Sequence, residues 1–176
     1  MSEVQPFPDW LFEDLGGRIS RGAAAGLVSG LVFLLATMGY VTTKDLPAIA
    51  PLLDISTIFH GTDMPTDDPT KVPVDAFAGL VLHLTLAALY GVVFALFVPL
   101  ARNIAFLAVG AVAYGLLLYV FNFQIFGRIL FEWFTDPKGP DQGFEIFIHA
   151  VFGLLLAPFF VGALRMRAAP VASDSR

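Results

Sequence analysis

Four runs of apolar residues, each about as long as a helix that crosses a bilayer, make up most of this chain. They cover residues 21–41, 76–98, 103–124 and 143–164. A helix needs about 20 residues to cross about 30 Å of hydrocarbon, because each residue adds 1.5 Å. The runs lack the alternating polarity of membrane strands. The pattern therefore predicts an all-α fold, a four-helix transmembrane bundle in up-down-up-down order, with residues 1–176 as one integral membrane domain.

The polar segments between the runs are unequal in length. Residues 100–103 form a very short turn, which predicts that the second and third spans are antiparallel neighbours. Residues 42–75 and 125–142 form two longer loops, and the third span is expected to continue into 125–134, with a bend at Gly127. Amphipathic stretches predict short interfacial helices at Phe7–Leu15, where a frayed tail is the alternative, and at Ile49–His60.

Composition fits a membrane protein and excludes several functional classes. Of 176 residues, 57% are hydrophobic and 14% are charged, which is too apolar for a soluble domain. A net charge of −5 argues against a nucleic-acid partner. The absence of cysteine excludes disulfides, thiolate metal sites and cysteine-ligated iron–sulfur clusters. Because no phosphate-binding loop or catalytic triad is recognisable, we expect at most a non-catalytic subunit of an enzyme complex.

The distribution of Lys and Arg predicts the orientation in the membrane. On one side, basic residues lie close beside the spans; these are Arg18, Arg21, Arg102, Arg165, Arg167 and Arg176. On the other side, they are spread over the longer loops; these are Lys44, Lys71, Arg128 and Lys138. By the positive-inside rule the first side is cytoplasmic. We therefore expect a multi-pass protein of the bacterial inner membrane with both termini in the cytoplasm.

Small residues at a spacing of four predict where helices approach one another closely. Gly22, Gly26 and Gly30 open the first span, Gly79 and Gly91 lie in the second, and Gly153 lies in the fourth. Such ridges let two helix backbones come into contact, or let a helix approach a flat cofactor. The alternative is that glycine is simply common in membrane spans.

Two histidines form the candidate site. His83 lies about seven residues into the second span and His149 about six into the fourth, and both spans run inward. Both rings are therefore expected about 10 Å below the outer surface. Each histidine belongs to a stripe of small residues, which is typical of a helix face that meets another helix or a flat group. Glu145, one turn before His149, is a candidate partner for it.

The paired histidines resemble the haem b arrangement of cytochrome b. The resemblance covers only His83, His149 and their stripes, and each cytochrome b helix carries two histidines where each helix here carries one. It implies one haem b between the two rings near the outer face, with Arg128 as a partner for a propionate.

Other ligands for the pair stay open. A metal ion would need a third ligand, which Glu145 or His60 could supply beside His83 and His149. A quinone would accept a hydrogen bond from one of the two histidines, with Tyr90 or Tyr119 nearby. The alternative is that the histidines only hydrogen-bond across helices or line a small wet cavity.

The chain is also similar, over most of its length, to small uncharacterised four-helix inner-membrane proteins of bacteria. Short motifs carry this resemblance: Pro51–Leu52–Leu53–Asp54–Ile55, His83 with Tyr90–Gly91, Tyr119–Phe123, and His149–Gly153. The resemblance implies the fold and supplies no activity.

Together these patterns predict a small accessory or electron-carrying subunit of a larger membrane redox complex, either respiratory or photosynthetic. Its partners would be membrane lipids and other membrane-protein subunits. One alternative is a proton or metal transporter that uses Glu145, His149 and His83, although few polar residues continue the path inward. The other is a purely structural or assembly protein.

Overall fold

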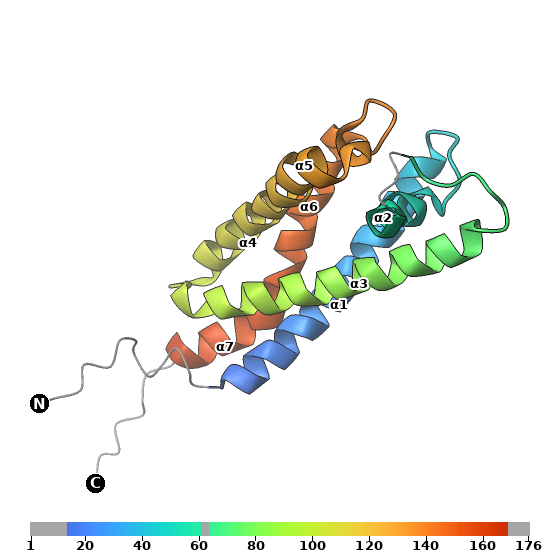
Figure 1. The fold of residues 1–176 in the computed structure, drawn as a ribbon. Helices are drawn as coiled ribbons and strands as arrows, with labels where there is room; N and C mark the ends of the chain where they lie inside the picture. Colours follow the sequence, from blue (N-terminus) through green and yellow to red (C-terminus); the bar gives the residue numbers. More distant parts are fainter. Residues whose placement is uncertain (1–13, 61–63, 169–176) are drawn as a thin grey trace, which may run out of the picture.

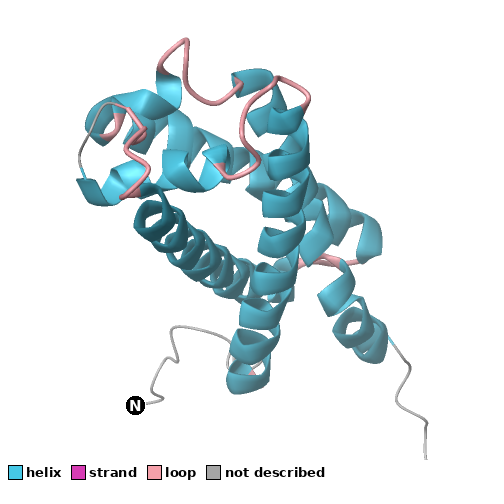
Figure 2. Ribbon diagram, turned by 90° about the vertical axis from the view of Figure 1, so that its right-hand side faces the viewer, coloured by secondary structure: helices cyan, strands magenta, loops and turns pink. Residues whose placement is uncertain are grey.

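The computed structural model describes residues 14–60 and 64–168, with side chains to residue 164, and this part is helical without strands (Figures 1 and 2). Four helical stretches are long and apolar enough to cross a membrane: Leu15–Thr42, Val72–Leu100, Ile104–Leu130 and Gln142–Leu164. They alternate in direction, which confirms the predicted all-α four-helix bundle. Of the predicted amino-terminal surface helix, residues 1–13 lie outside the described residues.

Individual elements subdivide these stretches. The first is α1 (Leu15–Thr42), and the second is α3 (Val72–Phe97) with η2 (Val98–Leu100). The third joins α4 (Ile104–Tyr119), η3 (Val120–Gly127) and α5 (Arg128–Leu130). The fourth joins α6 (Gln142–Leu156) and α7 (Pro158–Ala168), and Pro158 divides it. Two short helices remain, α2 (Ala50–His60) and η4 (Glu132–Thr135).

The bundle consists of two helix pairs. α1 packs along α3, α4 packs along α6, and α1 also contacts α6. The second and third spans are antiparallel and contact each other through side chains, Phe94 with Tyr114 and Tyr114 with the main chain of Tyr90, but α3 and α4 diverge from their short connection and make few close backbone approaches (Figure 1). A short turn fixes where two helices meet, whereas side chains along their length decide whether they stay together.

Glycine explains the close packing inside each pair. A Cβ on Gly26 of α1 would overlap the carbonyl oxygen of Ala87 in α3, and one on Gly22 would lie 2.7 Å from the carbonyl oxygen of Gly91. In the other pair, a Cβ on Gly153 would overlap the carbonyl oxygen of Ala111. The backbones therefore touch at these points, which requires residues without side chains.

The remaining predicted packing glycines also lie at close approaches. A Cβ on Gly30 would collide with the Ala87 side chain, and a Cβ on Gly91 would overlap the carbonyl oxygen of Gly22. A Cβ on Gly79 would overlap the carbonyl oxygen of Leu52, so Gly79 lets α2 rest directly on α3. The helix α2 thus docks against the first pair instead of lying apart on the surface.

The third span departs from α-helical geometry before the predicted bend at Gly127. Residues Val120–Gly127 form the π-helix η3, in which residues five apart share one face. Gln124 Nε2 donates to Tyr119 Oη at 2.8 Å, and Tyr119 Oη donates to Gln142 Oε1 at 2.9 Å. Through these hydrogen bonds, Tyr119 and Gln124 of the third span are connected to Gln142 in the first turn of α6.

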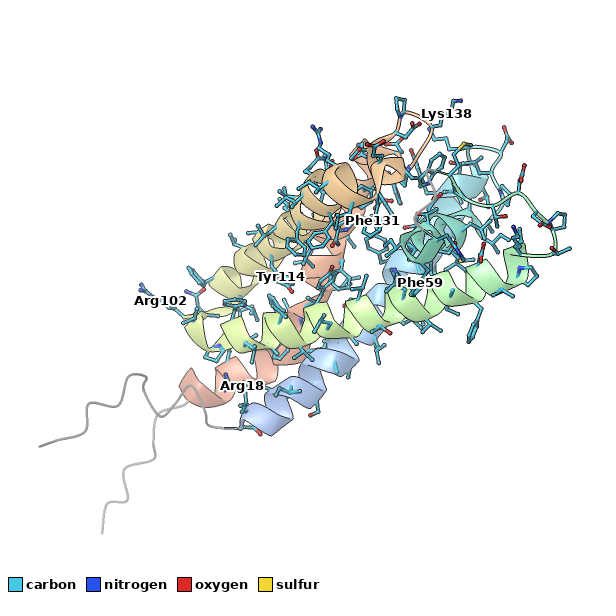
Figure 3. The ribbon with its side chains drawn as sticks, in the orientation of Figure 1. Arg18, Phe59, Arg102, Tyr114, Phe131 and Lys138 are labelled. Atoms are coloured by element: carbon cyan, nitrogen blue, oxygen red, sulfur yellow. The ribbon has the colours of Figure 1, made fainter. Side chains whose placement is uncertain are left out.

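The two ends of the bundle differ in their surroundings. Arg18 and Arg102 lie at the end where α1 begins and α3 meets α4, and Lys138 lies at the opposite end (Figure 3). Most loops gather at that opposite end, together with α2 (Figures 1 and 2). The end with few loops is the one for which the sequence predicts a cytoplasmic location.

Candidate functional site

A cavity of about 510 Å³ lies between the two helix pairs and contains the predicted site. Residues of α1, α2, α3, η3 and α6 line it, among them His83, Tyr90, Glu145 and His149. Volumes of this order are typical of small-molecule sites. The structure therefore brings both histidines to one cavity, as their matched depth suggested.

Some of the apolar residues that line the cavity are also exposed on the outside of the bundle. On α3 and η3, Leu89 is 53% exposed, Phe121 is 42% and Phe126 is 39%. These residues belong to stretches that are long and apolar enough to cross a membrane, so a bilayer would surround them.

His83 holds the first helix pair together. Its Nε2 lies 2.8 Å from the carbonyl oxygen of Gly30 on α1. A carbonyl oxygen can only accept, so Nε2 carries the proton and donates. In the neutral ring, Nδ1 is then a hydrogen-bond acceptor. This is the cross-helix hydrogen bond that the sequence predicts as the alternative to ligand binding.

His149 turns back to its own helix. Its Nδ1 donates to the main-chain oxygen of Glu145 at 2.7 Å, whereas the Glu145 carboxyl atom Oε2 lies 3.5 Å away from the same nitrogen. The ring is 6% exposed and contacts the rings of Phe33, Tyr119 and Phe123 at centroid distances of 5.0 to 5.9 Å. The expected pairing with Glu145 therefore involves its main chain more closely than its carboxyl group.

Phe33 of α1 contacts both imidazoles, and the histidines do not fit a haem held between them. The centroid of the Phe33 ring is 5.5 Å from that of His83 and 5.0 Å from that of His149. The Nε2 atom of His83 also donates to Gly30, so it is not available to coordinate iron. The proposed propionate partner, Arg128, donates from Nε to Gln124 Oε1 and does not line the cavity.

The four residues proposed as metal ligands do not come together. Within the described residues, no group of three or more His, Cys, Asp or Glu side chains could hold a metal ion. His60 ends α2, where its Nε2 lies 2.8 Å from Asp75 Oδ1, away from the histidine pair. The reason is that α2 docks on α3, which pairs His60 with the first turn of that helix.

Asp54 of α2 lines the cavity and was not singled out from the sequence. Its Oδ1 accepts a hydrogen bond of 2.7 Å from Trp133 Nε1 in η4. Burial raises the pKa of the Asp54 carboxyl to about 6, against a smaller lowering by the Trp133 hydrogen bond. A lone acid within the apolar run 51–55 is the signal that could have identified it.

Asp141 forms a second acidic edge of the cavity. Its Oδ2 accepts a 2.7 Å hydrogen bond from Tyr40 Oη, and its Oδ1 accepts one from the Phe144 amide. The Tyr40 hydrogen bond, followed by that from Phe144, lowers the pKa of the Asp141 carboxyl. Asp141 therefore supplies a fixed negative charge at the outer end.

Tyr90 connects the diverging helices α3 and α4. Its Oη donates to Asn122 Oδ1 in η3 at 2.6 Å, and Tyr114 Oη donates to the main-chain oxygen of Tyr90 at 2.7 Å. Figure 3 shows Tyr114 on the α4 side of this gap. Tyr90 lines the cavity, but its hydroxyl group already donates its proton to Asn122 and cannot also donate it to a ligand.

Comparisons with protein-family models, with curated proteins and with solved structures each find no match to this chain. The likenesses to cytochrome b and to small four-helix membrane proteins therefore stay predictions, and function has to be argued from the cavity.

Proposed function

We propose that this protein is a non-catalytic membrane subunit whose bundle binds an apolar small molecule taken from the lipid phase. The observation that carries the proposal is the cavity of about 510 Å³ between the helix pairs, some of whose apolar lining residues on α3 and η3 are exposed on the outside of the bundle. Its walls are mostly apolar, and a few polar side chains converge at its outer end. That combination is typical of sites that orient a lipophilic ligand by one polar group.

We also propose that this subunit acts within a larger membrane redox complex. A haem-binding form of the subunit has the least support, because Phe33 contacts both imidazole rings and His83 Nε2 is hydrogen-bonded to the Gly30 carbonyl oxygen. A quinone also has weak support, because the N–H group of each neutral histidine already donates to a main-chain oxygen. A metal transporter has no ligand group of three within the described residues.

Photolabelling with adamantyl diazirine, an apolar probe, tests the binding proposal in lipid nanodiscs. We expect labels on Phe123 and Phe152, which are 6% and 5% exposed and can be reached only through the cavity. Leu86→Trp, which fills the cavity, should reduce this labelling. Leu117→Trp is the matched control, because Leu117 is 62% exposed and does not line the cavity. Labels confined to lipid-facing residues would contradict the proposal.

We also propose that the end carrying Arg18 and Arg102 faces the cytoplasm of a bacterial inner membrane. The chain contains no cysteine, so single cysteines report topology without background. A membrane-impermeant maleimide added to spheroplasts should label Lys138→Cys and leave Arg102→Cys unlabelled, and both positions are exposed. The reverse pattern would invert the orientation.

A further inference from the structure

The charged side chains that line the cavity are all acidic within the described residues. Three acids line it, namely Asp54, Asp141 and Glu145, and no Lys or Arg of the described residues does. Asp141 has a lowered pKa and remains ionised. Lys44 is a cation close to Asp141, with its Nζ 5.3 Å from the centre of the Tyr40 ring, but it does not line the cavity. The charged side chains that line the cavity are therefore acidic, which favours a positively charged guest.

Glu145 is the deepest of the three acids and has little compensation from the protein. It is 6% exposed, and it lies in the first turn of the membrane-spanning helix α6. Its one polar contact within the described residues is the 3.5 Å approach to His149 Nδ1, a nitrogen that already donates elsewhere at 2.7 Å. A buried carboxyl group without a good donor is costly, so it is expected to have a functional partner.

The two histidines add acceptors rather than donors. The proton of His83 is on Nε2 and that of His149 is on Nδ1, each bonded to a main-chain oxygen. The second nitrogen of each neutral ring can only accept a hydrogen bond. A ligand that matches the histidines and Glu145 must therefore donate.

Aromatic rings complete the site. Eight phenylalanines of the part that the structure describes line this cavity: Phe33, Phe121, Phe123, Phe126, Phe131, Phe134, Phe144 and Phe152. Faces of aromatic rings attract cations, more strongly where water is excluded. The same rings would also pack against an apolar ligand body.

We propose that the cavity selects a lipophilic amine in its protonated form, with its N–H groups directed at Glu145. This inference rests on the proposed function and specifies its ligand class. An ammonium group supplies both the positive charge and the donors that the acids and imidazoles lack. A neutral lipophile would leave Glu145 unpaired, and a quaternary ammonium or phosphonium would supply charge without a donor.

The fluorescent amine 9-aminoacridine tests this selection in nanodiscs of zwitterionic lipid at neutral pH, where it is protonated. Fluorescence anisotropy should show binding to the wild-type protein, and acridine, which is neutral under these conditions, should compete about 10- to 100-fold less well. Tetraphenylphosphonium, a cation without N–H groups, should also compete weakly. Glu145→Gln should weaken binding by a similar factor, because an amide keeps the size but cannot ionise to pair with the ammonium group.

Asp67→Asn is the matched control, since Asp67 is exposed in the outer loop and does not line the cavity. It changes net charge equally and should leave binding unchanged. Equal affinity for 9-aminoacridine and acridine in the wild-type protein would overturn the inference without any variant. An unaffected Glu145→Gln, or equal competition by tetraphenylphosphonium, would do so as well. If any of these overturning results occurs while adamantyl diazirine still labels the cavity, the selection of a protonated amine is contradicted and the proposed binding of an apolar molecule is not.

Discussion

The contacts inside each helix pair differ in kind from the contacts between the pairs. Inside α1/α3 and inside α4/α6, glycines bring backbone against backbone. Between the pairs, rings and hydrogen-bonded side chains make the connection: Tyr40 stacks on Phe144 with centroids 3.9 Å apart, and Tyr90 bonds to Asn122. The first kind of contact leaves no space, whereas the second encloses the cavity.

The two kinds of contact are therefore expected to contribute to different properties, namely stability and ligand binding. Backbone contacts at Gly26 and Gly153 cannot adjust without moving a whole helix. Side-chain bridges can change rotamer, so the spacing between the pairs can adapt to a guest at small cost. We therefore expect stability to depend on the pairs and ligand binding to depend on the junction between them.

The largest effect is expected from adding one methyl group inside a pair. Gly26→Ala and Gly153→Ala each place a Cβ against a carbonyl oxygen of the facing helix, so each should lower the free energy of unfolding by about 3 kcal/mol. Unfolding by SDS titration, followed by circular dichroism, measures this.

Gly110→Ala is the matched control for these two substitutions. Gly110 lies in α4, and a Cβ there would meet nothing within 4 Å. Its stability should be unchanged or slightly higher. If all three variants were equally stable, backbone contact would not be what holds the pairs.

The next largest effect on stability is expected at the hydrogen bond between Trp133 of η4 and Asp54 of α2. Because the folded pKa of Asp54 is about 6, above its ordinary 3.8, the folded state retains the proton where the unfolded state releases it. The free energy of unfolding should therefore fall as pH rises from about 4 to 6, by about 2 kcal/mol after allowance for partial exposure.

Asp54→Asn removes the titrating proton and keeps an oxygen for Trp133 Nε1 to bond. Its unfolding free energy should lack this decline, and the difference between the two pH profiles isolates Asp54 from other groups. If the unfolding free energies of the wild-type protein and Asp54→Asn changed in parallel between pH 4 and 6, ionisation of Asp54 would not affect the stability of the folded protein.

A smaller effect is expected at the hydrogen bond inside the first pair. His83→Leu removes the bond to Gly30 and should destabilise the protein by about 1 kcal/mol or less, since cross-helix hydrogen bonds in membranes contribute little each. Thr85→Val is the control, because Thr85 Oγ1 bonds to Val81 within α3 itself. Equal stability of both variants would leave His83 without a role in pairing.

The smallest effect is expected at the exposed edge of the junction. Tyr40→Phe retains the stack on Phe144 and loses only the exposed hydrogen bond to Asp141, so the free energy of unfolding should change less than in any variant above other than the controls. The sharper readout is the Asp141 carboxyl, whose lowered pKa should rise towards its ordinary value in this variant. A carboxyl-selective NMR titration would detect this, and an unmoved pKa would exclude Tyr40 as the cause.

The features that the sequence predicted are those set by length and spacing. Run length in apolar residues gave the four spans, and the four-residue stripes through His83 and His149 became buried faces, with Asp75, Gly79, Ala87 and Gly91 among the buried residues of α3. Small residues identify a packing face because backbones can approach only there. Counting residues along parallel spans predicted one level for both histidines, and both line the same cavity.

The features that the sequence did not predict depend on contacts between distant segments. Phe33 lies 116 positions before His149, and no local periodicity brings its ring into contact with both imidazoles. Asp54 meets Trp133 only because α2 folds back over the bundle. The π-helix was missed because its hydrogen bonds depend on how Tyr119, Gln124 and Gln142 meet, which residue identity alone does not fix.

The divergence of α3 and α4 also relates the protein to bilayer thickness. Val72–Leu100 has 29 residues and Ile104–Leu130 has 27, about 40 Å of helix each, where about 30 Å of hydrocarbon needs to be crossed. Overlong helices relieve hydrophobic mismatch by tilting. Their backbones are connected at one end only, and hydrogen bonds such as that from Tyr90 to Asn122 link them across the gap. A thinner bilayer would therefore increase their tilt and strain these hydrogen bonds, and a thicker one would relieve the strain.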